Sequence, residues 1–187
     1  MNWTGVLPAM TTAFDEDYNV DHAFVARHAQ WLVENGCTGI ICLGSLGEAP
    51  TLRFEEKIDI LTTVVAALDG KAPVVAAISA LSTAEAVELA QAAQTVGCSG
   101  LMILPPYVYK GDWRENKAHV AAILQATPLA GMLYNNPVSL YVAFRGVRID
   151  SRFGGKAVRP LGQPWLSLSR RSAAAPLFLR RGESKAF

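Results

Sequence analysis

Polar side chains in this sequence gather in short loops that follow apolar runs. The first loop, Gly44-Ser45-Leu46-Gly47, combines two glycines three residues apart with a hydroxyl. Glycines permit a tight turn with exposed backbone N–H groups, so this loop could form a concave site for an anion such as a carboxylate. A plain glycine turn before a helix would explain the same residues, and the spacing alone does not separate the two interpretations.

Two later loops carry phenol groups. Tyr134 begins the segment YNNP, and a phenol at the carboxyl end of a strand can relay protons, although an ordinary core tyrosine fits the position equally well. The segment PPYVYK at 105–110 has prolines that stiffen the chain and tyrosines that could stack on a ligand or hydrogen-bond to it. A rigid loop of packed aromatic rings is the alternative interpretation.

Histidine and cysteine chemistry is not indicated. The three histidines all fall in predicted helices rather than in these loops (His22, His28 and His119). A Ser-His-Asp site or a metal site is therefore not expected. The three cysteines have irregular spacing without a CxxC pair, which favours buried thiols over a disulfide framework or a zinc site (Cys37, Cys42 and Cys98).

The composition is that of a globular protein. The 187 residues are 51% hydrophobic and 18% charged, with a formal net charge of +1, which excludes a disordered chain. No secretory leader and no apolar run close to 20 residues is visible, so we expect a cytoplasmic protein without a membrane span. Residues 1–143 hold seven basic and fourteen acidic side chains, whereas residues 144–187 hold ten basic and two acidic ones, a change from −7 to +8.

The elements that must position the loops alternate along residues 1–143. Short apolar runs without in/out alternation predict strands covered on both faces, at 5–11, 39–43, 73–78, 100–104 and 131–134. Helices are predicted between them, with starts at four capping residues (Asp21, Thr51, Ser82 and Asp112). The first helix should present Phe24, His28, Trp31 and Leu32 on one face, and the second Phe54, Ile58, Leu61, Val65 and Leu68.

Strands that alternate with helices predict a parallel sheet with right-handed crossovers. A doubly wound sheet and a (β/α)8 barrel both satisfy this pattern, and periodicity does not separate them. The first strand–helix turn has no GxGxxG, which argues against a dinucleotide-binding unit.

Several segments together resemble the dihydrodipicolinate synthase/N-acetylneuraminate lyase family. GSLGEAPTL is similar to the family's G-[ST]-x-G-E loop, LPPYVYK to its P-P-Y-x segment, LYNNP to its Y-N-x-P turn, and the opening GVLPAMTTAFDEDYNVD to its first strand and loop. The resemblance covers about residues 3–142 in the right order. It implies a (β/α)8 TIM barrel, usually a homotetramer, that acts on pyruvate or a related 2-keto acid through a lysine Schiff base, with no cofactor.

By this resemblance, Ser45 and the backbone N–H of Leu46 would hold the keto acid's carboxylate, within the turn that Gly44 and Gly47 shape. Tyr134 would relay the proton that forms and breaks the imine. Two positions depart from the family's pattern, with Leu46 where a second hydroxyl is often found and Val108 where a tyrosine is often found. These departures favour a sugar-acid or hydroxyproline-pathway lyase or dehydratase over dihydrodipicolinate synthesis.

The family's lysine belongs at the end of a sixth strand. The predicted strand ends are spaced by 32, 35, 26 and 30 residues, so the next would fall near 160–169, where PLGQPWLSLS has no lysine. Lys156 is the nearest candidate, but it follows Tyr134 by only 22 residues. An eight-unit barrel needs about 250 residues. We therefore expect an incomplete barrel of about five units at 1–143, with impaired activity.

The Arg-rich segment 144–187 has no sustained period, and its best candidate element is 173–179, interrupted by Pro176. The abrupt change of composition near residue 143 is what a shifted reading frame would produce. Two other function classes remain open. The half-barrel could bind a keto acid without turnover, or its basic segment could bind acidic partners, although no nucleic-acid-binding motif accompanies the arginines.

Overall fold

The computed structural model describes residues 1, 3–108, 111–135 and 175–179. Their centre is one sheet in which four parallel strands follow one another in chain order. These are β1 (Ile40–Cys42), β2 (Val74–Ile78), β3 (Gly100–Ile103) and β4 (Ala130–Asn135). A fifth strand, β5 (Ala175–Leu179), pairs antiparallel with β4.

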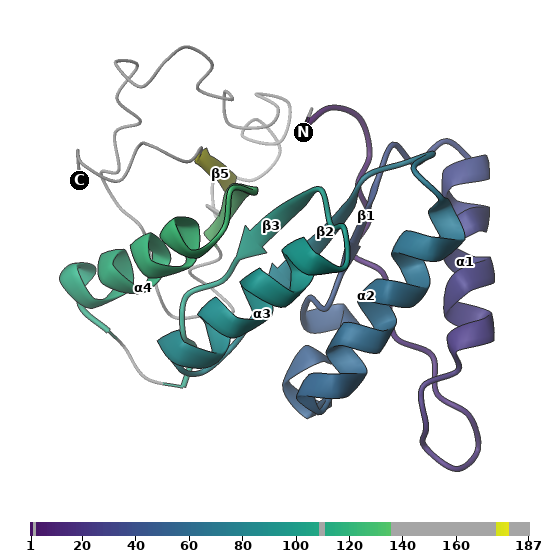
Figure 1. Ribbon diagram of the computed structural model, residues 1–187, viewed down its shortest axis with the longest axis horizontal. Coiled ribbons are helices and arrows are strands. Elements are labelled where there is room, and N and C mark those ends of the chain that lie inside the picture. Colours follow the sequence, from purple (N-terminus) through teal and green to yellow (C-terminus); the bar gives the residue numbers. More distant parts are fainter. Residues whose placement is uncertain (2, 109–110, 136–174, 180–187) are drawn as a thin grey trace, which may run out of the picture.

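Three α-helices connect the parallel strands and a fourth precedes β1, and all four pack side by side along one side of the sheet (Figure 1). They are α1 (His22–Glu34), α2 (Phe54–Leu68), α3 (Thr83–Thr95) and α4 (Trp113–Ala126). A doubly wound sheet reverses its strand order at a switch point and carries helices on both faces. The sequential order and the single helical layer therefore favour the barrel, as predicted, with about half of its strands present among the described residues.

Three of the four predicted helix starts are confirmed. The side chains of Asp21, Ser82 and Asp112 each accept a hydrogen bond from the backbone N–H three residues ahead, at 2.8 to 3.1 Å. The prediction for Thr51 is wrong, because α2 begins at Phe54. The Thr51 hydroxyl instead donates to the Glu48 carbonyl (2.9 Å) inside a short 3-10 turn, η2 (Ala49–Thr51).

The predicted first strand at 5–11 forms only one parallel bridge, between Ala9 and Ile41 on the outer edge of β1. The Ile41 N–H donates to the Pro8 carbonyl (2.9 Å) and the Met10 N–H to the Ile41 carbonyl (2.8 Å). Pro8 has no N–H to extend the regular ladder, and the next bond between the two segments runs from the Thr38 N–H to the Val6 carbonyl (2.8 Å). The segment still lies beside β1, where a barrel's first strand belongs.

The predicted inner face of α1 is only partly confirmed. Leu32 packs against the core. The residues that the helix buries are Val25 and Ala29, whereas Phe24 and Trp31 are 46% and 57% exposed, with the His28 ring between them (centroid distances 5.7 and 6.3 Å). On α2, the predicted face is rotated, because Lys57, Ile60 and Val64 are buried beside Leu61 and Leu68.

The core lies between the helices and the sheet, and every described residue of β1, β2 and β3 is buried. Of the cysteines, Cys42 and Cys98 are buried in this core and Cys37 is half-buried. Burial raises the pKa of the Cys98 thiol to about 12 and that of Cys42 still further, so both stay protonated and unreactive. No helix among the described residues is long and apolar enough to cross a membrane.

β5 falls within the run 173–179 that the sequence singled out in the basic segment. Pro176 is compatible with this strand because β5 pairs along its length with β4 and has no second partner in the described sheet. The other residues of 144–187, Lys156 among them, lie outside the described part of the chain.

Candidate active site

The loop after β1 begins with an unusual backbone turn. Leu43 has a φ of +64°, after which Gly44 is extended and Ser45–Gly47 forms a 3-10 turn, η1. The Gly47 N–H donates to the Gly44 carbonyl (3.0 Å), which closes the turn. The N–H groups of Ser45 and Leu46 precede that bond and have no acceptor within the turn, so they can bind an anion.

The predicted tight turn does run from Gly44 to Gly47, but neither glycine has a positive φ. The left-handed positions are Leu43 and Glu48, immediately outside the pair. Gly47 is required for close packing instead, since a Cβ there would lie 3.1 Å from the Met10 carbonyl oxygen.

A buried hydroxyl fixes the loop from the neighbouring segment. Thr12 Oγ1 donates to the Gly47 carbonyl at 2.7 Å, across 35 residues of sequence. Thr12 is buried, so this bond is shielded from water. The sequence predicts no particular role for Thr12. Its role depends on a contact between distant segments, which local patterns do not report.

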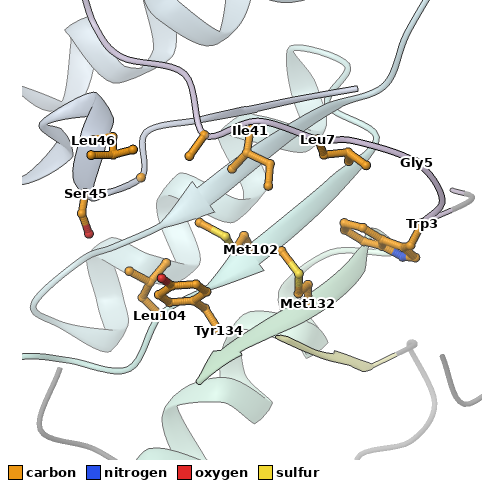
Figure 2. A pocket seen from close by; sticks show the side chains of 12 residues that line it. Trp3, Gly5, Leu7, Ile41, Ser45, Leu46, Met102, Leu104, Met132 and Tyr134 are labelled. Atoms are coloured by element: carbon orange, nitrogen blue, oxygen red, sulfur yellow. The ribbon is translucent and has the colours of Figure 1, made fainter. Parts of the chain in front are cut away.

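The loop faces an open cavity of about 370 Å³ on the side of the sheet away from the helices. Its lining is mostly apolar and includes Met102, Leu104 and Met132 from β3, its end and β4. Ser45 and Tyr134 supply hydroxyls at the same end of this cavity, and Figure 2 shows both pointing into the space between them. An apolar cavity with a few convergent polar groups is typical of a small-molecule site.

The structure thus brings together most of the predicted site residues. Gly44, Ser45 and Leu46 line the cavity together with Tyr134, and Gly47 lies directly behind them, against Thr12 and Met10. The Leu46 side chain is 63% exposed at the edge of the site.

The proline-rich segment after β3 lies apart from this cavity. Tyr107 is half-buried and bonds to Ser79, and burial raises the pKa of its phenol. Val108 is exposed, and neither side chain is among the residues that line the cavity. The prediction that a tyrosine of this segment contacts a ligand therefore has no support from the described residues. Tyr109 and Lys110 lie outside them.

Histidines and metal-ligating groups stay outside the site. His22 bonds to Thr63 (2.8 Å) and His119 to Thr83 (3.0 Å), each between neighbouring helices. Within the described ranges, no three His, Cys, Asp or Glu side chains gather as a metal site. The cavity lining holds no lysine among the residues that the structure covers. The buried Lys57 lies between α2 and α3 and pairs with Glu85 at 3.0 Å.

Comparison with known proteins identifies the family. The sequence model of the dihydrodipicolinate synthetase family matches residues 2–143. The chain belongs to this family. The 4-hydroxy-tetrahydrodipicolinate synthase 2 of Halalkalibacterium halodurans is 39% identical over 137 residues, which are 73% of this chain and 47% of that protein. The synthase of Prochlorococcus marinus is 41% identical over 133 residues, 71% of this chain and 44% of its own length.

Solved structures of the dihydrodipicolinate synthase family share the fold. The dihydrodipicolinate synthase DapA-2 from Bacillus anthracis superposes with a TM-score of 0.74 at 34% identity, covering 76% of this chain and 49% of that chain. YagE, a prophage protein of the family from E. coli K12 solved in complex with pyruvate, gives 0.72 at 29% identity, with 74% and 47% covered. The chain thus spans about half the length of the relatives it matches.

Proposed function

We propose that this chain carries the keto-acid-binding half of a family lyase or aldolase that acts on pyruvate or a related 2-keto acid through a lysine Schiff base. The observation that carries the proposal is the convergence of Ser45 and Tyr134 on one cavity. Ser45 follows β1 and Tyr134 lies in β4, the two outer strands of the described parallel sheet. A family member that binds pyruvate supports the choice of ligand.

In this proposal the carboxylate of the keto acid lies against the loop after β1. The Ser45 hydroxyl and the Leu46 N–H donate to its oxygens, and Gly44 leaves the approach open. The ketone carbon then faces the middle of the cavity, toward Tyr134. When an amine adds to this carbon, the ketone oxygen must be protonated and leave as water, and we assign the relay of that proton to the Tyr134 phenol.

The amine is the part of this chemistry that the described residues do not supply. We propose that the chain binds a keto acid without forming the imine. If an imine does form, Lys156 is the first lysine to examine. The family match ends at residue 143, where the net charge of the sequence changes sign. We therefore propose a boundary after residue 143, with 144–187 translated from a shifted reading frame. Translation of the coding DNA in the other two frames would test this boundary.

Borohydride reduction in the presence of pyruvate tests the missing imine. A Schiff base would be trapped as a stable adduct and located by peptide mass spectrometry, and we expect none. An adduct on Lys156 or on any other lysine would refute the impaired activity. Lys156→Arg would then show whether that residue is the nucleophile.

Binding is tested separately by calorimetry with millimolar pyruvate. Ser45→Ala should weaken affinity about tenfold, because a charge-assisted hydrogen bond is lost. Ser99→Ala is the matched control, since Ser99 lies at the amino end of β3, at the opposite end of the sheet from the loop. If both variants bind pyruvate as the parent does, the carboxylate site is wrongly placed. If the parent itself does not bind, the proposed function fails.

A further inference from the structure

The backbone at Leu43 is strained in a way that no other described residue shares. Leu43 has a φ of +64° and is 1% exposed. Left-handed backbone is unfavourable for residues with a Cβ, and it is a genuine outlier for a bulky apolar one. The other described non-glycine residues with a positive φ are polar or aromatic and exposed (Tyr18, Glu48 and Asp69). Strain of this kind persists only where the surroundings impose it.

The strained residue sits between the sheet and the site. β1 ends at Cys42, Leu43 turns the chain out of the strand, and the next residues are Gly44 and Ser45. The far end of the loop is held separately, by the bond from Thr12 to the Gly47 carbonyl. The left-handed turn at Leu43 is therefore what sets the direction in which the Ser45 and Leu46 N–H groups point.

We infer that Leu43 is a positioning residue for the carboxylate loop, the segment 44–47 that would hold the keto acid's carboxylate. Its left-handed backbone aims the donors of Ser45 and Leu46 into the cavity, and its buried side chain anchors that turn in the core. This inference rests on the proposed function, since the loop's ligand is the proposed keto acid. It assigns the role to a residue that touches no ligand itself and that is absent from the cavity lining of the described chain.

Two substitutions separate this role from ordinary packing. Leu43→Ile keeps the volume and the burial, but its branched Cβ disfavours the left-handed backbone further. Leu43→Gly accepts a positive φ freely and gives up the buried side chain. Leu101→Ile is the matched control, because Leu101 is an equally buried leucine of β3 with no positive φ and no place in the cavity lining.

The measurements are the pyruvate dissociation constant by calorimetry and the urea midpoint of unfolding. Leu43→Ile should weaken pyruvate binding about fivefold, because the competent loop is less populated, and Leu101→Ile should leave it unchanged. Leu43→Gly should have the lowest urea midpoint yet bind pyruvate within about twofold of the parent. Affinities that instead follow the order of stabilities would overturn the inference, as would a Leu43→Ile variant that binds like the parent.

Amide NMR separates a failure of this inference from a failure of the proposed function. Leu43→Ile should shift the Ser45 and Leu46 resonances without any ligand, and Leu101→Ile should not. If the parent binds no pyruvate but these amides move, the proposed function fails and the positioning role stands. If the amides do not move, the positioning role is refuted. The comparison of the two isoleucine variants decides the matter even if Leu43→Gly does not fold.

Discussion

Removing the Thr12 hydroxyl should loosen the carboxylate loop while leaving the core volume unchanged. Thr12→Val deletes the 2.7 Å bond to the Gly47 carbonyl and leaves that carbonyl without its donor in a buried place. A buried acceptor without a partner costs about 1–3 kcal/mol, so the free energy of unfolding should fall by about 2 kcal/mol. Thr12→Ser keeps the hydroxyl and loses one methyl group, so it should cost about 1 kcal/mol.

Urea unfolding of the two variants and the parent provides the assay, read from the midpoint and slope. The pyruvate affinity should fall for Thr12→Val, because Gly47 closes the turn that presents the Ser45 and Leu46 N–H groups. Thr12→Ser should bind like the parent. If the valine variant is no less stable than the serine variant, the hydrogen bond contributes nothing and the loop is held by packing alone.

Two further predictions concern the helical layer. Glu85→Gln should destabilise the protein by about 1–2 kcal/mol, because the Lys57 side chain is only 7% exposed and would lose its charged partner, whereas Glu85 itself is 38% exposed. A double-mutant cycle with Lys57→Met measures this coupling, and equal costs of Glu85→Gln in both backgrounds would disprove it. Burial lowers the pKa of His119, so its stabilising contribution is present above its unfolded pKa near 6.5 and declines as the pH falls below that value. His119→Gln should flatten the urea midpoint between about pH 6.5 and 5 relative to the parent, and an unchanged pH slope would contradict this assignment.

Local chemistry in the sequence predicted the helices and most strands well. Helix starts at Asp21, Ser82 and Asp112 depend on a side chain and a backbone N–H three residues apart, so the sequence contains the whole interaction. Thr51 is also a residue type that can cap a helix, but its hydroxyl donates to a carbonyl next to η2, and the helix begins only at Phe54. Residue type indicates which groups can cap a helix, and the path of the preceding loop decides which one does.

Features that depend on contacts between distant segments could not be predicted from the sequence. The inner face of α1 was predicted from its largest apolar residues, yet the residues that this helix buries are Val25 and Ala29. The role of Thr12 needed the position of Gly47, and the left-handed turn at Leu43 appeared at a residue type that no propensity would select. Both of these missed residues adjoin the candidate site, where strain and long-range hydrogen bonds are expected to collect.

The separate fixing of the Ser45 loop and of Tyr134 supports the proposed keto-acid binding by a chain that matches its relatives over about half of their length. The carboxylate loop is held by β1, by the turn at Leu43 and by Thr12, all of which lie within residues 12–43. Tyr134 is held by β4, whose neighbour β3 continues the same parallel sheet back to β1. β4 also pairs with β5, which places Pro176 opposite Tyr134. The proposed carboxylate recognition and the proposed proton relay would therefore depend on one continuous sheet. In the proposed chemistry, imine formation would need in addition an amine that the described residues of the cavity do not supply, so we expect turnover to be lost while keto-acid binding is retained.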